Sequence, residues 1–190
     1  MPGRTPRAAV DAFLEPLRAA SACITMSQWV CSPIKGQPVG ELHSVFLNKA
    51  DPVSFKIPNS KISLEASIKF TVVQQDQDIY GQPVGSHDRF KVSTRGYMYS
   101  VTSSDDEEQI AWHWHPDGAS NVTFPHAHIG TAALNPDGLL KKKDHLRTGR
   151  MTFESVVFNM IQWGVTPRNL NFKEILEANQ AKFDKWKSWG

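Results

Sequence analysis

Alternating apolar and polar residues dominate the first two thirds of the chain, which is the pattern of β-strands with one buried face. In "LEASIKFTVV" (64–73), every second residue from Leu64 to Val72 is apolar, and the residues between them are polar. Successive side chains of a strand point to opposite faces, so this segment predicts a half-buried antiparallel strand. Similar stretches, separated by turns, predict further strands over 41–50, 90–104, 109–115 and 122–130.

Apolar residues near the start of the chain follow a different rule, because they recur three and four positions apart. This spacing predicts an amphipathic helix over 6–20, with Thr5 as its N-cap. Pro16 lies inside the helix and lacks a backbone N–H, so we expect it to kink or shorten the helix.

The same spacing predicts two helices after the strands, over 153–163 and 172–188. Thr152 is the predicted N-cap of the first of these helices, and Gly164 is its predicted stop. The sequence therefore predicts a single α+β domain over 1–190. Its largely antiparallel sheet is flanked by one N-terminal helix and two C-terminal helices.

Composition and charge narrow the class of protein only broadly. Hydrophobic residues make up 40% of the chain and charged residues 21%, which is typical of a globular protein. The net charge of +2 is too small to indicate a nucleic-acid partner by itself. No segment approaches the ~20 apolar residues of a membrane span, and the start lacks the apolar core of a signal peptide. We therefore expect a cytoplasmic protein with no membrane partner.

The two cysteines, Cys23 and Cys31, fall in "ACITMSQWVC" (22–31), a stretch rich in residues that favour strands. On one extended strand they would lie about 26 Å apart at ~3.3 Å per residue, so they could not bond to each other. We expect two buried free thiols, in keeping with a reducing compartment.

Four of the seven histidines form two His-x-His pairs in the predicted hairpin over 109–130. Strand parity places Trp112 and Trp114 on one face of the first strand and the histidines on the other. In the second strand Ala127 takes the apolar face. If the two strands pair, four imidazoles project from the same open face: His113, His115, His126 and His128.

This histidine pattern leaves three interpretations open. Histidine is an acceptable surface residue of a sheet, so the pairs could be structural. Neutral imidazole is also a common ligand of Zn²⁺, although no cysteine or glutamate accompanies either pair at a close ligand spacing. In the third interpretation no metal binds, and a pair among these histidines acts as catalytic base and acid in phosphodiester cleavage.

A basic segment follows the hairpin, in the predicted loop over 140–151. Its cationic residues could hold a phosphate, or they could simply be solvated: Lys141, Lys142, Lys143, Arg147 and Arg150. Further candidates for lining the same surface are Arg95, Tyr97, Tyr99 and His145. The sequence contains no Gly-rich nucleotide loop, no Gly-x-Ser-x-Gly elbow and no His-Glu-x-x-His motif.

The order of these motifs resembles the TumE-type family of bacterial toxin–antitoxin toxins. The similar elements are the strand "YMYSV", the strand "IAWHWH", then "FPHAHIG" and an amphipathic helix, together covering roughly 64–163. The motif "HWHPDG" stands where that family carries an Arg-x-Asp-Asn segment. The resemblance implies a compact α+β protein that acts in the bacterial cytoplasm, with RNA as its target and an antitoxin as its partner.

The sequence thus supports three functional hypotheses. The first is a phosphodiester-cleaving enzyme, a ribonuclease of toxin or defence type, which uses the histidine-lined face and no cofactor. The second is a hydrolase of a small substrate that depends on Zn²⁺ or another divalent metal bound by the same histidines. The third is a non-enzymatic module that binds a protein or a nucleic acid.

Overall fold

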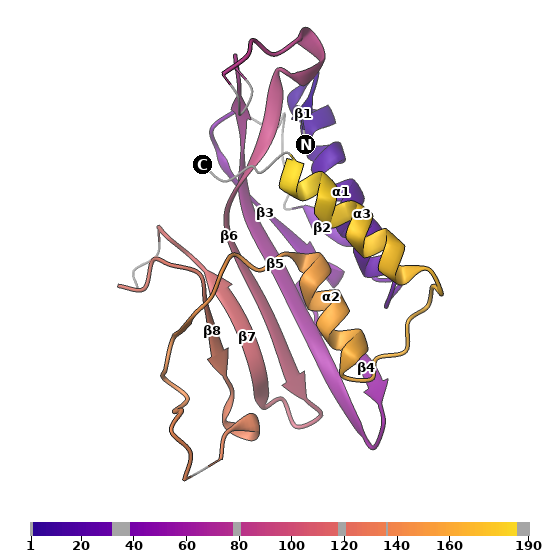
Figure 1. The fold of residues 1–190 in the computed structure, drawn as a ribbon, viewed down its shortest axis with the longest axis vertical. Helices are drawn as coiled ribbons and strands as arrows, with labels where there is room; N and C mark the ends of the chain where they lie inside the picture. The colour runs from indigo at the N-terminus through magenta and orange to yellow at the C-terminus, as the bar shows by residue number, and fades with distance from the viewer. Residues whose placement is uncertain (1, 32–38, 78–80, 118–120, 136, 186–190) are drawn as a thin grey trace.

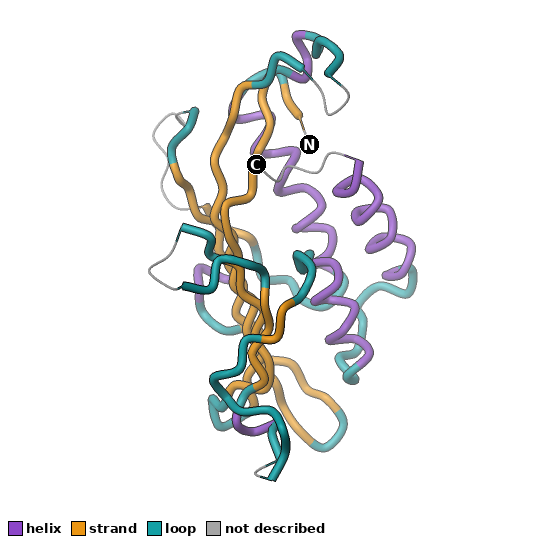
Figure 2. Tube along the Cα trace, turned by 60° about the vertical axis from the view of Figure 1, so that its left-hand side comes forward, coloured by secondary structure: helices purple, strands orange, loops and turns teal. Residues whose placement is uncertain are grey.

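A computed structural model describes residues 2–31, 39–77, 81–117, 121–135 and 137–185. The strands form one nine-stranded sheet in which all pairs are antiparallel. The three helices lie on one face of this sheet (Figures 1 and 2). The predicted α+β class is therefore confirmed.

The two longest strands form the centre of the sheet and pair with each other along their length. The sheet order is β2-β3-β5-β6-β7-β8-β9, with β4 also paired to β5 and β1 to β6. The bounds of the strands are β1 Pro2–Gly3, β2 Trp29–Cys31, β3 Leu42–Leu47, β4 Val53–Ile57, β5 Ser60–Gln74, β6 Phe90–Ser103, β7 Glu108–Trp114, β8 His126–Ile129 and β9 Leu146–Arg147.

The helices begin and end close to where their sequence signals place them. They are α1 Pro6–Ala22, α2 Phe153–Gln162 and α3 Phe172–Lys185. Thr152 caps α2, because its Oγ1 accepts a hydrogen bond from the backbone N–H of Ser155 at 3.3 Å. After α2, Gly164 adopts a φ of 105°, a conformation that favours glycine. The last residues of the predicted third helix, 186–188, lie outside the described residues.

The apolar face of the sheet packs against the helices and forms the core. Phe13 of α1 contacts Phe70 of β5, with ring centroids 5.3 Å apart. Tyr99 of β6 contacts Phe153 of α2 in the same way, at 5.9 Å. Because every helix covers this face, the opposite face of β5, β6, β7 and β8 has no helix over it (Figure 2).

The strand predicted over 22–31 is wrong for most of its length. Helix α1 continues past Pro16 to Ala22, and Cys23 is its C-cap. Only Trp29–Cys31 form a strand. After Ala22 the chain forms a turn in which Cys23 and Ile24 are buried, so tertiary packing outweighs the strand propensity of this segment. Both cysteines are free, but Cys31 is only partly buried.

The lengths and apolarity of the helices are relevant to the prediction that the protein has no membrane partner. Among the residues that the structure describes, no helix is both long enough and apolar enough to cross a membrane.

Candidate functional site

The pairing of β7 with β8 brings the two His-x-His motifs together. His113 lies directly opposite His126, and Trp112 lies opposite Ala127. The Trp112 ring stacks on Trp163 just after α2, with centroids 6.0 Å apart, so the tryptophan side of β7 faces the helices. The prediction that the tryptophans and the histidines lie on opposite faces of the sheet is confirmed. Among the described residues, the histidines occupy the face that the helices leave uncovered.

Five imidazoles form a cluster on this face, which we call the histidine cluster: His113, His115, His126, His128 and His145. His126 lies at its centre, because its ring centroid is 4.9 Å from those of His128 and His145 and 5.6 Å from that of His113. His126 has no exposed surface, whereas His113, His115 and His128 are partly buried.

The fifth histidine comes from the basic segment. Strand β9 pairs with β8, with Leu146 opposite Ala127 and Arg147 opposite His126. This pairing turns the chain back onto the hairpin, so that His145 lies with its ring centroid 4.5 Å from that of His128. His145 itself is exposed and forms the rim of the cluster.

Three of these residues have the arrangement of metal ligands. One ring nitrogen from each of His113, His126 and His128 can be chosen so that all three atoms lie within 4.8 Å of one another. Nitrogen ligands at ~2.0–2.1 Å from a tetrahedral metal are about 3.4 Å apart. Small side-chain rotations would therefore bring the three nitrogens to the ligand spacing.

Backbone groups orient two of the three rings. The Nδ1–H of His126 donates to the carbonyl oxygen of Phe124 at 2.9 Å, which leaves Nε2 as the nitrogen with a lone pair. This Nε2 is buried and has no hydrogen-bond partner among the residues that the structure describes. His128 likewise hydrogen-bonds to the backbone of Lys142. Metal-binding histidines typically use their second ring nitrogen in this way.

The electrostatics of the cluster favour neutral imidazoles. Burial and, after it, the charges of the neighbouring histidines, His128 first among them, together lower the pKa of His113 to about 4. Burial is also the main cause that lowers the pKa of His126 and of His128. Neutral imidazoles have the free lone pairs that a metal requires.

Glu108 also lies near the cluster, although no motif in the sequence marks it as a site residue. Its charge acts on His128 by raising the pKa of that imidazole. Plain alternation would place Glu108 on the same side as Trp112, but Gln109 is a bulge residue between the Thr102–Glu108 and Val101–Ile110 pairs. The bulge reverses the parity and turns Glu108 to the histidine face. No local signal in the sequence marks this bulge.

The structure divides the basic segment into separate environments. Lys141, Lys142 and Lys143 are exposed beside His145, and Lys141 Nζ donates to the Gly138 carbonyl oxygen at 3.0 Å. Arg147 lies over the ring of Phe124, with its Cζ 5.0 Å from the centroid.

Arg150 lies in a different environment from the exposed lysines, because its guanidinium packs on an aromatic ring. Its Cζ lies 3.8 Å from the centroid of the Trp114 ring. Trp114 points to the helix-covered face. Its register partner, Tyr97, is also buried there.

The expectation that Arg95, Tyr97 and Tyr99 line one face is also wrong. Arg95 is a bulge residue, because Thr94 pairs with Phe70 and Gly96 pairs with Lys69. Beyond the bulge, Tyr97 and Tyr99 point toward the helices, where they stack with centroids 4.9 Å apart. Arg95 instead reaches the open face and donates from Nε to Thr71 Oγ1 at 3.2 Å.

The tyrosines therefore have a structural role. The backbone N–H of Met151 donates to the Tyr97 hydroxyl at 2.8 Å, which ties the end of the basic segment to β6. Burial raises the pKa of both tyrosines, so both hydroxyls stay protonated.

Comparisons with known proteins leave this geometry as the basis for an assignment of function. No family model matches the chain, no curated protein is similar to it, and no solved structure resembles its fold.

Proposed function

We propose that the protein is a metal-dependent hydrolase whose divalent ion is bound by His113, His126 and His128. The observation that carries this proposal is the buried Nε2 of His126. Within the described part of the chain it has no hydrogen-bond partner, while Nδ1 is held by a backbone carbonyl. An unpaired buried polar atom costs about 1–3 kcal/mol, so it requires an explanation. A metal ion accounts for it directly.

The ligand set indicates the kind of metal and the chemistry. Imidazole nitrogens suit Zn²⁺, Ni²⁺, Cu²⁺ and Fe²⁺, and three histidines are a known ligand set of catalytic Zn²⁺. Such an ion keeps a coordination position for water and lowers the pKa of that water to about 7. This chemistry suits the hydrolysis of an ester or a phosphoester.

Two further groups complete the proposed site. His145 is exposed at the rim, 4.5 Å from His128 between ring centroids, and we assign it the proton transfer between water and product. Glu108 acts electrostatically on His128 and stabilises the positive charge that collects at the cluster when a metal binds.

The charges around the cluster favour an anionic substrate. Lys141, Lys142 and Lys143 lie in the segment that carries His145. Together with the resemblance to TumE-type toxins, this charge makes RNA the first substrate to test and a cognate antitoxin the first protein partner to seek.

A ribonuclease that needs no metal is the second candidate function. It is favoured by the close pair of His128 and His145, which lies beside the three lysines and could supply one base and one acid. The lowered pKa of His128 suits the base, because it keeps that imidazole neutral.

Metal content distinguishes the two candidates. Untagged protein is stripped with a chelator, dialysed against Zn²⁺, Ni²⁺, Mn²⁺ or Fe²⁺, and analysed by elemental mass spectrometry. We expect about one equivalent of Zn²⁺ in the wild type and in His87→Ala, a control for an exposed histidine outside the cluster. His126→Ala should retain less than a tenth of that amount. Equal metal in all three proteins would refute the site.

Activity is then measured on bis(p-nitrophenyl) phosphate and on RNA, each with and without chelator. A metal-dependent hydrolase loses turnover with the chelator and regains it with Zn²⁺. RNA cleavage that persists in chelator, and that is lost in both His128→Ala and His145→Ala, would support the metal-free ribonuclease instead.

A further inference from the structure

A cavity of about 360 Å³ opens beside the histidine cluster, on the side of β5 and β6. Its lining consists of Ser67, Lys69, Tyr97, Met98, His113, Trp114 and His115, among which Ser67, Lys69 and the two histidines offer polar groups to a ligand. This volume falls in the range of small-molecule sites, roughly 300–1,000 Å³. The cavity therefore adjoins the proposed metal site and shares His113 with it.

The strand register explains why the cavity lies there. Ser67, Met98, His113 and His126 form one row across four strands, since each is the register partner of the next. In the neighbouring row, Lys69 pairs with Gly96, which has no side chain. A Cβ at Gly96 would meet the carbonyl oxygen of Trp114 at 2.7 Å, so β7 approaches β6 closely there. The cavity lies between Lys69 and His115, next to the row that carries the proposed ligands.

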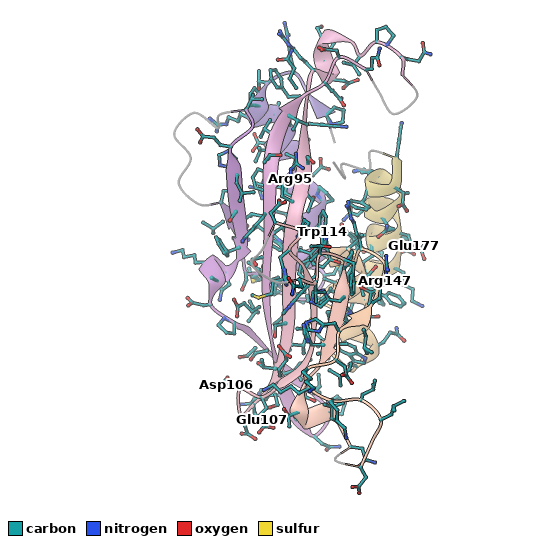
Figure 3. The ribbon with its side chains drawn as sticks, turned by 90° about the vertical axis from the view of Figure 1, so that its left-hand side faces the viewer. Arg95, Asp106, Glu107, Trp114, Arg147 and Glu177 are labelled. Atoms are coloured by element: carbon teal, nitrogen blue, oxygen red, sulfur yellow. The ribbon has the colours of Figure 1, made fainter. Side chains whose placement is uncertain are left out.

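The wall on the β5 side is cationic. Lys69 is exposed and forms no ion pair within the described part of the chain. Arg95, the bulge residue beside Gly96, reaches the same face and is anchored to Thr71. The acidic turn that holds Asp106 and Glu107 lies at the other end of the sheet from Arg95 (Figure 3). An anion in the cavity would thus meet positive charge and the Ser67 hydroxyl.

We propose that this cavity binds a second phosphate group of the substrate, beside the phosphate that reacts at the histidine cluster. This proposal rests on the proposed function. Ser67 and His113 lie two strands apart, about 10 Å at ~4.8 Å per strand. The long Lys69 side chain and the imidazoles narrow this gap from both sides. Two phosphates joined by one sugar, as in a nucleotide strand or a nucleoside bisphosphate, fit this arrangement.

Lys141, Lys142 and Lys143 add positive charge on the far side of the cluster from β5. Cationic residues on both sides of the row, with the histidines between them, indicate that the ligand crosses the strands of the sheet. A ligand of this kind has several phosphates, and the reacting one lies in the middle.

The test compares two probes by isothermal titration calorimetry with Zn²⁺-loaded protein. Uridine 3′,5′-bisphosphate should bind the wild type about tenfold more tightly than uridine 3′-monophosphate, because the second phosphate gains charge-assisted hydrogen bonds. Lys69→Ala should remove this advantage without changing metal content. Equal affinities of the two probes for the wild type, or an unchanged advantage in Lys69→Ala, would overturn the proposal.

Lys61→Ala is the matched control, since Lys61 is exposed on the same strand about 26 Å from Lys69 at ~3.3 Å per residue. It should keep the tenfold advantage of the bisphosphate. Loss of the advantage in this variant too would mean that net charge alone governs binding, and would overturn the assignment to Lys69. Ser67→Ala should show a smaller loss of about threefold, because one neutral donor is removed.

The same titrations separate a failure of the cavity from a failure of the metal site. If no metal binds, the probes are compared with metal-free protein, and binding of the bisphosphate that depends on Lys69 supports the cavity alone. Hexauridylate distinguishes the two sources of the ligand. If hexauridylate competes with the bisphosphate in the wild type, but not in Lys69→Ala, the natural ligand is a nucleotide strand. If the bisphosphate binds and hexauridylate does not compete with it, the natural ligand is a free nucleotide.

Discussion

Strands β6 and β7 have two faces that differ in almost every physical property. On one face, Tyr97, Tyr99 and Trp112 are buried against helices and have aromatic neighbours. On the other face, imidazoles such as those of His113 and His126 lie within 6 Å of one another without a helix over them. The first face can supply stability because it removes apolar area from water. The second face cannot, because burial of unpaired imidazoles is unfavourable.

This difference between the faces indicates how the molecule can tolerate the unfavourable free energy of the histidine cluster. A buried polar atom without a partner, such as Nε2 of His126, costs about 1–3 kcal/mol. Aromatic packing under α2 on the same strands can offset that cost many times over. One face can stabilise the fold while the other carries the proposed site, because alternating side chains let each strand contribute to both faces.

Adjacent residues of β7 give the sharpest form of this comparison and the largest expected effect. Trp112→Ala should lower the free energy of unfolding by about 3–5 kcal/mol, because it leaves a cavity under Trp163. His113→Ala, one residue later on the other face, should change it by less than about 1 kcal/mol in the presence of chelator. Urea unfolding followed by circular dichroism measures both values. Similar losses in the two variants would contradict the division between the faces.

The pH dependence of the unfolding free energy should also distinguish the two faces, because their contributions to stability change with pH in opposite directions. His113 has a pKa of about 4, below the ordinary value near 6.5, so the unfolded chain binds more protons between these values. Stability from this face is present above pH 6.5 and is lost as the pH falls toward 4. Burial raises the pKa of Glu154 to about 7, from an ordinary value near 4.5. Stability from this group is present below pH 4.5 and is lost as the pH rises to 7.

A shift of 2.5 pKa units corresponds to at most about 3.4 kcal/mol, at 1.36 kcal/mol per unit. The contribution of His113 is smaller than this limit, because that side chain is only partly buried and solvent screens it. Glu154→Gln removes the second contribution, so its unfolding free energy in chelator should fall on acidification from pH 6.5 to 4. His113→Ala should show a weaker fall or a rise over the same range. Urea midpoints at several pH values test this expectation, and parallel profiles for the two variants would contradict it.

Metal addition should stabilise the protein through the histidine face alone. At a free Zn²⁺ concentration one hundred times Kd, binding adds about 2.7 kcal/mol to the unfolding free energy. Differential scanning fluorimetry should show this as a higher Tm for the wild type and for His87→Ala, but not for His126→Ala. A Zn²⁺-induced shift of the same size in His126→Ala would place the metal elsewhere.

The two arginines of the basic segment should give the smallest effects. Arg150 is partly buried over the Trp114 ring at 3.8 Å, whereas Arg147 is exposed over Phe124 at 5.0 Å. Arg150→Ala should therefore cost about 1–2 kcal/mol of stability, and Arg147→Ala less than about 1 kcal/mol. Denaturant unfolding measures both. A larger loss for Arg147→Ala would show that the exposed edge at β9 matters more than we propose.

Local patterns predicted the elements of this fold well. The alternation in β5, the spacing and caps of α2, and the parity of the two His-x-His motifs depend only on neighbours within a few residues. These features agree with the structure. The strand predicted over 22–31 is wrong for most of its length, because α1 continues to Ala22 and Cys23 and Ile24 are buried in the turn that follows, which no local pattern reports.

The errors at the site share one cause. Bulges at Arg95 and Gln109 each insert one residue opposite a partner strand and so reverse the parity beyond them. As a result Tyr97 and Tyr99 leave the open face, and Glu108 joins it. A bulge depends on how two strands pair, so it cannot be found from the alternation of a single strand.

The sequence by itself determined that four histidines share one face of a sheet, because a period of two is a property of each strand alone. Only the tertiary structure decided that His145 joins them, through the pairing of β9 with β8. It also decided that Lys69, in a strand far from the histidines in sequence, borders the same cavity. Such contacts depend on chain return and strand order, which are set by the packing of the whole domain.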